Sequence, residues 1–286
     1  MYQLGLSSCG YPITEEMFRA YQESGIANIE ISFGIKEEVT ENLDCAKISA
    51  LSKQYGVNLW SYHLPFGHFN VLDISSCNPE VQKDSIQYLS DLIKRVSDIG
   101  IDKYIIHPSG EPIEDAERPE RMKRAKESLA ELAKVAAACG GTIAVEDLPR
   151  TCLGNCSDDM LDLLSADESL RACFDTNHLL GEDIVEFIRK VGKKFITTHV
   201  SDYDFKNERH WLPGEGKINW TAVLDALQEV GYQGLWLYEI SMTTPDSILR
   251  ERVLTHADFV KNANELFSGK PLTVFGTPKP NLPSWK

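Results

Sequence analysis

Acidic and histidine side chains recur at the ends of short apolar segments, and their types suit metal ligation. Four segments carry them: Glu146 follows "TIAV", Asp175 follows "RACF", His199 follows "FITT" and Glu239 follows "LWLY". Three carboxylates and one imidazole form a mainly oxygen-donor set that suits one divalent ion, Mn²⁺, Mg²⁺ or Co²⁺, and does not exclude Zn²⁺. A six-coordinate ion held this way keeps two positions free for adjacent oxygens of a polyol or hydroxyketone.

Each of these residues also has a simpler structural explanation. Asp175 could cap the helix that follows it, and Glu239 could be one side of an ion pair. However, acids inside apolar segments become buried unpaired charges, which cost several kcal/mol unless a cation or hydrogen bonds compensate them. Three carboxylates that converge also repel each other, and a divalent ion removes that repulsion. We therefore favour ligation, and a carboxylate can ligate and cap through its two oxygens.

The elements that must position these residues alternate between strand and helix eight times. The predicted strands cover 2–8, 27–33, 58–64, 103–109, 142–148, 171–178, 194–201 and 235–241. Helical spacing of apolar residues lies between them, as in "VQKDSIQYLSDLIKRVSDIG", with a glycine at the expected end of the helix. Thr14 is a candidate N-cap of the first helix, and Asn219 or Thr221 is a candidate N-cap of the seventh. This pattern predicts an α/β fold, a (β/α)8 barrel. The alternative is a doubly wound open sheet, but no phosphate-binding glycine loop follows the first strand.

We expect one barrel domain over residues 1–267 and an extended tail over 268–286. The tail, "SGKPLTVFGTPKPNLPSWK", carries four prolines and no helical period. It is expected to lie over the barrel or over a neighbouring subunit, which leaves a homo-oligomer open.

The composition limits which kinds of partner the protein can bind and indicates its cellular compartment. With 42% hydrophobic and 25% charged residues, the 286-residue chain can bury a large core. A net charge of −14 argues against non-specific binding to nucleic acid or to an anionic membrane. No secretory signal is visible, and no apolar run approaches the roughly 18 residues of a membrane-spanning helix. Seven cysteines without paired metal-type spacing indicate reduced thiols and a cytoplasmic protein.

The other histidines crowd the same predicted rim. In a barrel of this kind the carboxyl ends of the strands build the active site. His63 ends the third strand, His107 the fourth, His178 follows Asp175, and His210 lies in the loop after the seventh strand. The second strand carries Glu30 near its end.

These segments resemble the sugar phosphate isomerase/epimerase family of xylose isomerase-like TIM barrels, which includes ketose 3-epimerases and inosose dehydratases. The resemblance covers roughly residues 2–265. It rests on "VED" (145–147), "FDTNH" (174–178), "HVSD" (199–202), "HWLPGEGKINW" (210–220) and "YEI" (238–240). It implies that Glu146, Asp175, His199 and Glu239 bind one divalent metal. It also implies that Glu146 and Glu239 exchange protons with substrate, and that His178 and His210 contact substrate oxygens.

The resemblance implies a cytoplasmic carbohydrate-metabolism enzyme, an isomerase or epimerase, that works by proton transfer through an enediolate. Glu146 would remove a proton next to the carbonyl of a sugar and Glu239 would return one. His63 and His107 would extend the polar wall of the site. Arg209, with Arg150 and Lys206, is a candidate for phosphate binding if the sugar is phosphorylated; "GEGK" (214–217) is interpreted as a turn that orders its loop.

Three other functions stay open at this stage. A keto-sugar or inosose dehydratase or lyase would use the same enediolate. An endonuclease IV-like phosphodiesterase would need three zinc ions, and its ligand pattern is traceable here with Glu208 in place of an aspartate. That branch acts on DNA, and the negative charge and sparse basic loops count against it. A sugar sensor would bind the same ligand without chemistry.

Overall fold

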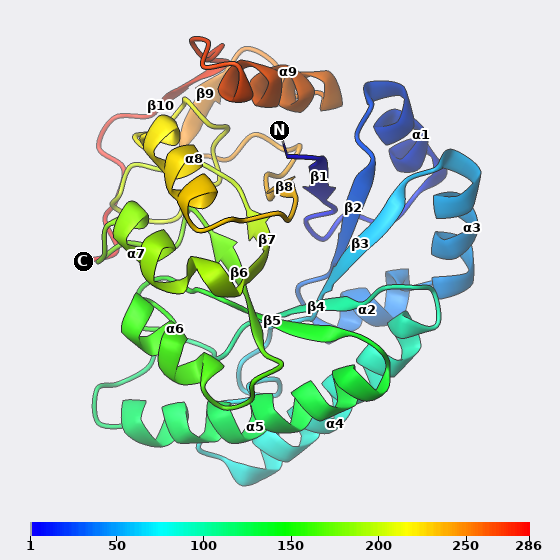
Figure 1. Cartoon of the computed structure of the whole chain (residues 1–286), viewed down its shortest axis with the longest axis vertical. Coiled ribbons are helices and arrows are strands. Elements are labelled where there is room, and N and C mark those ends of the chain that lie inside the picture. Colours follow the sequence, from blue (N-terminus) through cyan, green and yellow to red (C-terminus); the bar gives the residue numbers. More distant parts are fainter. Residues whose placement is uncertain (1) are drawn as a thin grey trace.

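The structure, a computed structural model, describes residues 2–286 and is a (β/α)8 barrel, as the sequence predicts. Figure 1 shows the strands as an inner ring that helices surround. The eight barrel strands are β1 (Leu4–Ser7), β2 (Asn28–Ser32), β3 (Asn58–His63), β4 (Lys103–Ile106), β5 (Thr142–Glu146), β6 (Arg171–Asp175), β7 (Phe195–His199) and β8 (Trp236–Tyr238). Every one lies inside its predicted range.

The strands pair in parallel in the order β7-β6-β5-β4-β3-β2-β1-β8, so neighbours in sequence are neighbours in space. A parallel bridge between Val200 and Tyr238 closes the ring between β7 and β8. The amide of Val200 donates to Leu237 (2.8 Å), and the amide of Glu239 donates to Val200 (3.2 Å). Closure therefore fixes the backbone of Glu239 directly beside the end of β7.

The helices form the outer layer. They are α1 (Glu15–Ser24), α2 (Lys36–Asn42), α3 (Cys45–Tyr55), α4 (Pro79–Ser97), α5 (Arg118–Ala138), α6 (Ser157–Leu164), α7 (Ile184–Val191), the 3₁₀ turn η1 (Gly192–Lys194), α8 (Trp220–Glu229) and α9 (His256–Phe267). The side chain of Thr14 accepts a backbone hydrogen bond at the start of α1, which confirms the predicted cap. At the start of α8 the cap is Asn219, not Thr221. No helix among residues 2–286 has both the length and the apolar character needed to cross a bilayer.

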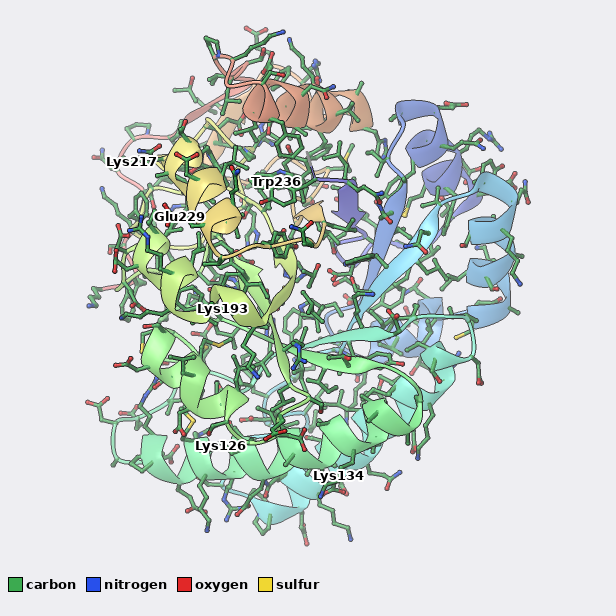
Figure 2. All side chains as sticks on the ribbon, viewed as in Figure 1. Lys126, Lys134, Lys193, Lys217, Glu229 and Trp236 are labelled. Atoms are coloured by element: carbon green, nitrogen blue, oxygen red, sulfur yellow. The ribbon has the colours of Figure 1, made fainter. Side chains whose placement is uncertain are left out.

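The hydrophobic core lies between the strands and the helices. Trp236 of β8 is fully buried, with its ring 5.7 Å from that of Trp220 on α8 and 5.5 Å from that of Phe267 on α9. In Figure 2, Lys134 of α5 and Glu229 of α8 lie in the outer layer, whereas Trp236 lies inside it. Apolar side chains thus face the helices, which leaves the inner face of the strands for polar ones.

The C-terminal tail is extended over most of its length and pairs once with the chain before α9. Its strand β10 (Gly276–Pro278) runs antiparallel to β9 (Ile248–Arg250). In Figure 1 the red tail then passes outside α8 and ends near α7. There the amide of Trp285 donates to the carbonyl of Lys206 (3.1 Å). The tail thus lies over the loop that joins β7 to α8; the division into one barrel domain and a tail stays a prediction.

A buried ion pair joins the same loop to β9. Arg250 and Glu215 both have fully buried side chains, and Nε of Arg250 donates to Oε1 of Glu215 (3.1 Å). We expect Glu215→Gln to lower the free energy of unfolding by about 3–5 kcal/mol, because it leaves the Arg250 charge buried without its partner. Urea unfolding followed by circular dichroism measures this change.

Glu229→Gln is the matched control, because Glu229 pairs with Arg189 at the exposed surface of α8. An exposed pair contributes at most about 1 kcal/mol. Equal unfolding midpoints for the two variants would show that the Arg250–Glu215 pair does not hold the loop.

Candidate metal centre and substrate cavity

A cavity of about 620 Å³ opens at the carboxyl ends of the strands, the end of a (β/α)8 barrel where active sites are built. Nine of the residues singled out in the sequence line it: His63, His107, Glu146, Arg150, His178, Glu208, Arg209, His210 and Glu239. Asp175 and His199 are fully buried and do not line it. The cavity thus brings together residues from the ends of strands that lie far apart in the sequence, such as β3, β5 and β8.

Three of the four predicted ligands lie against one another. The Nδ1 atom of His199 lies 2.8 Å from Oε1 of Glu146 and 3.6 Å from Oε1 of Glu239. One ligand atom from each, together with one from His63, falls within 4.8 Å of all the others. Donor atoms bound to one ion at 2.0–2.1 Å lie about 3–4 Å apart, so these spacings fit a shared divalent cation.

Asp175 stands beside this group and shares Glu146 with it. One ligand atom each from Glu146, Asp175 and His178 forms a second set within 4.8 Å. The Oδ1 atom of Asp175 accepts the amide of Asn177 (2.6 Å), whereas Oδ2 is buried without a hydrogen-bond partner. Burial raises the pKa of Asp175 to about 7, with the nearby His178 opposing the rise. One oxygen therefore orders the turn, and the other is free to ligate.

The charge balance of the centre also fits a cation. Burial raises the pKa of Glu146, but the imidazoles of His199, His107 and His63 lower it further, so that the pKa lies well below its usual range. Burial lowers the pKa of His199, but Cys173 and the Glu239 carboxylate raise it to well above its usual range. The carboxylates thus stabilise positive charge between them, and a divalent cation can supply that charge.

A third group of candidate ligands lies nearer the cavity mouth. His178, Glu208 and His210 each place one ligand atom within 4.8 Å of the others, and His178 Nε2 lies 3.0 Å from Oε1 of Glu208. Burial lowers the pKa of His210, but the nearby carboxylates of Glu208 (Nε2 to Oε1, 3.8 Å) and Glu239 raise it to about 9. Arg150 also pairs with Glu208, so this carboxylate already has a cationic partner.

The predicted polar wall contains an aromatic surface as well. His107 Nε2 lies 3.2 Å from Oε2 of Glu146. The ring of Phe66 stacks on the His107 ring with centroids 4.3 Å apart, and Phe66 lines the cavity. The wall thus offers a ligand both hydrogen-bonding groups and an aromatic face, as small-molecule sites commonly do.

The loop from Ser201 to Asn219 is held by the buried carboxylate of Asp202. It accepts the amides of Tyr203 (2.8 Å), Gly214 (2.8 Å) and Ile218 (3.1 Å), and the indole N–H of Trp220 (2.9 Å). A Cβ on Gly216 would lie 2.2 Å from Oδ1 of Asp202, so the close approach requires glycine. "PGEGKINW" is therefore the segment that wraps this carboxylate, in line with the interpretation of "GEGK" as an ordering turn.

Two cavity-lining residues of this loop, Arg209 and His210, are positioned by Asn177. Its Oδ1 atom accepts the amides of Arg209 (3.0 Å) and His210 (3.4 Å). His210 has a left-handed backbone (φ 50°), which is strained for any residue other than glycine and often marks functional sites. The side chain of His210 meets the carbonyl of Glu239 (Nδ1 to O, 3.2 Å).

Arg209 lines the cavity, but its guanidinium donates to protein groups. Nε and Nη2 donate to Asp204 (3.2 and 3.1 Å), and Nη2 also donates to the carbonyl of Pro283 in the tail (2.6 Å). Its contact with substrate stays a prediction. Lys206 lines a separate cavity of about 240 Å³ beneath the tail.

The contacts of two residues in this region were not predicted from the sequence. His63 was predicted to contact substrate, which stays a prediction; it lines the cavity and also belongs to the group of candidate ligands that contains His199. Arg150 was a phosphate candidate, yet Nε donates to Glu111 (2.8 Å) and Nη1 to Asn207 (3.1 Å). The position of His63 at the end of β3 was the available signal; nothing in the sequence indicates the partners of Arg150.

Comparison with known proteins shows the family and the fold. Residues 18–261 match the family model described as "Xylose isomerase-like TIM barrel". A D-psicose 3-epimerase from Ruminiclostridium cellulolyticum is 28% identical over 200 residues, which is 66% of this chain and 65% of that protein. A D-tagatose 3-epimerase-like protein has a similar structure (TM-score 0.79, 22% identity, 94% of this chain and 97% of that one). So has an L-ribulose 3-epimerase (TM-score 0.74, 20% identity, 94% of each chain). At these identities the two structural likenesses show a shared fold.

Proposed function

The chain belongs to the xylose isomerase-like TIM barrel family, and from that premise we propose that it is a divalent-metal-dependent sugar isomerase or epimerase. The relatives named D-psicose 3-epimerase support the isomerase class. The observation that carries the proposal is the placement of Glu146 and Glu239. They come from β5 and from the end of β8, both line the cavity, and each places an oxygen within 4.8 Å of the other and of His199.

In the proposed reaction these two carboxylates act as bases on a sugar ketone. Glu146 removes the proton at the carbon next to the carbonyl, which leaves an enediolate, and Glu239 returns a proton to the other face or to the next carbon. A divalent cation held by Glu146, Asp175, His199 and Glu239, with His63 adjacent, would stabilise the negative charge that develops on the substrate oxygens. His178 and His210 bind hydroxyl groups and hold the reacting carbon between the two bases. The ion (Mn²⁺, Co²⁺, Mg²⁺ or Zn²⁺), a cytoplasmic location and a homo-oligomeric state stay predictions.

Proton NMR in D₂O over a panel of ketohexoses, ketopentoses and inososes tests the proposal. The reaction runs with added Mn²⁺, and each sample is then quenched and freed of Mn²⁺ before its spectrum is recorded. We expect deuterium at the carbon next to the carbonyl and new signals of the epimer or isomer. Deuterium together with loss of a hydroxyl from an inosose would assign the dehydratase instead. A panel without any exchange would refute proton transfer and favour a sugar sensor.

The charges around the cavity favour an uncharged sugar over a sugar phosphate. Arg150 and Arg209 are the only Lys or Arg side chains among the described residues that line it, and both are paired with carboxylates. A phosphate would have to displace Glu111 or Glu208 from Arg150, or Asp204 from Arg209. We therefore expect kcat/KM for a ketose phosphate to fall at least about 10-fold below that for the free ketose, which corresponds to about 1.4 kcal/mol.

Coupled assays with matched pairs, such as a ketohexose and its 6-phosphate, measure this ratio. A free 6-deoxyketohexose is the control for loss of the terminal hydroxyl alone. A higher kcat/KM for the phosphate would show that one of the two arginines leaves its carboxylate for the substrate.

One observation favours a second candidate, the trinuclear phosphodiesterase. The group of His178, Glu208 and His210 offers ligands for a further ion. The Arg150 guanidinium beside Glu208 opposes this, because a second dication there would have to replace it or approach it closely. Elemental analysis decides: about one metal per chain supports the epimerase, and about three zinc per chain support the phosphodiesterase.

A further inference from the structure

A fourth carboxylate, that of Glu30 on β2, lies inside the barrel next to the proposed ligands. Glu30 is fully buried. In "NIEIS" the strand alternation turns Glu30 toward the barrel interior, whereas Ile29 and Ile31 belong to the core against the helices. The Oγ atom of Ser61 on β3 donates to its Oε2 atom (2.7 Å). Glu30 does not line the cavity, so a substrate does not reach it.

The ring of His199 faces the Glu30 carboxylate. The Nε2 atom of His199 lies 3.1 Å from Oε1 and 3.2 Å from Oε2 of Glu30. Among the described residues no Lys or Arg forms an ion pair with Glu30, and its Oε1 atom has no hydrogen-bond partner. A buried carboxylate costs several kcal/mol unless it is compensated. Its compensation therefore comes from the Ser61 hydroxyl, from the His199 ring and from what that ring binds.

The two nitrogens of His199 face opposite carboxylate groups. Nε2 faces Glu30, whereas Nδ1 faces Glu146 (2.8 Å) and Glu239 (3.6 Å). A neutral imidazole ligates through the nitrogen that carries the lone pair, and an acceptor at the other nitrogen selects that tautomer and fixes the plane of the ring. A carboxylate acceptor also makes the ring a stronger donor to a metal.

We propose that Glu30 is a positioning residue: it accepts the Nε2–H of His199 and so presents the Nδ1 lone pair to a divalent cation between Glu146 and Glu239. This inference rests on the proposed metal centre. Ser61 holds the Glu30 carboxylate in the orientation that meets the ring. The set Ser61–Glu30–His199 thus extends the centre from the rim into the interior of the barrel.

Isothermal titration of the chelator-treated full chain with Mn²⁺ tests the proposal. We expect Glu30→Leu to raise Kd about 10- to 100-fold, the usual effect of removing a partner of a ligating histidine. Glu30→Gln should show a smaller rise, because its amide oxygen can still accept Nε2–H. The matched control is Asp258→Asn, which removes a carboxylate that caps α9 and binds Arg252 in the outer layer of helices. It should lower thermal stability and leave Kd unchanged.

A second readout follows the tautomer and stays decisive if Glu30→Leu does not fold. Long-range ¹H–¹⁵N correlation of the Zn²⁺-loaded wild type should show a proton on Nε2 of His199, and Glu30→Gln should weaken or exchange that signal. Wild-type Kd and an unchanged Nε2–H signal in a folded Glu30 variant would overturn the positioning role and leave the proposed function intact. A wild-type chain that binds no divalent cation would overturn both.

Discussion

Glu146→Gln is expected to lower deuterium exchange into the substrate by about 10²- to 10⁴-fold, the contribution of a positioned general base. The amide cannot accept the substrate proton, while its oxygen keeps the shape of the carboxylate next to His199. Exchange is measured by NMR in D₂O with saturating Mn²⁺, so that weaker metal binding does not limit the rate. Glu229→Gln is the control, because it makes the same chemical change on the exposed face of α8.

Glu239→Gln should give a different pattern if the two carboxylates serve opposite faces. The starting sugar should still exchange its proton with solvent through Glu146, whereas conversion to the epimer should fall by a similar factor of about 10²–10⁴. When the reaction starts from the epimer, Glu239→Gln should lose exchange, and Glu146→Gln should keep exchange and lose conversion. Equal loss of exchange and conversion in Glu239→Gln, from both sugars, would contradict the assignment of one base to each face.

Chelation is expected to reduce activity about 10²- to 10⁴-fold, and Mn²⁺ or Co²⁺ should restore it. A catalytic cation stabilises transition-state charge by several kcal/mol, and each 1.36 kcal/mol changes the rate tenfold. The buried carboxylates also lose their compensating charge, so Mn²⁺ should raise the melting temperature of the chelated protein in proportion to log concentration above Kd. Activity assays and thermal unfolding on the same chelator-treated sample measure both effects.

Protein treated with buffer alone controls for loss during handling. Full activity in a sample whose metal content falls below about one-hundredth of an ion per chain would contradict a metal-dependent reaction.

The barrel could be predicted because its signals are local in sequence. Each strand is a short apolar run, and the helix caps at Thr14 and Asn219 depend on residues within one turn. The predicted strands are longer than the observed ones, as with 27–33 against Asn28–Ser32, because apolar character continues beyond the last ladder hydrogen bond. The closure between β7 and β8 follows from the (β/α)8 topology once eight strands are counted.

The convergence of Glu146, His199 and Glu239 could also be predicted, because all three stand at strand ends of a barrel. Their exact partners could not. The group that includes His63 depends on side-chain directions at β3. The pairing of Glu30 with His199 joins strands on different sides of the barrel, and the sequence carries no sign of it. The sequence also does not show that one oxygen of Asp175 accepts the amide of Asn177 while the other faces the proposed centre.

The contacts of the tail and of the loop after β7 could not be predicted from the sequence, because they join segments that are far apart in the chain. The pairing of β10 with β9 and the hydrogen bond from Arg209 to Pro283 join segments that no local pattern relates. The sequence marked Arg209 as a cation near the site, and only the structure supplies Asp204 as its partner. A charge in a loop has no assigned role until its neighbours are known.

The most direct test is the anomalous-difference map of a crystal of the full chain soaked with Mn²⁺ and a ketose. We predict one strong peak in contact with oxygens of Glu146, Asp175 and Glu239 and with Nδ1 of His199, and two sugar oxygens that complete its coordination. Peaks confined to His178, Glu208 and His210, or an ion bound through Nε2 of His199, would contradict the account.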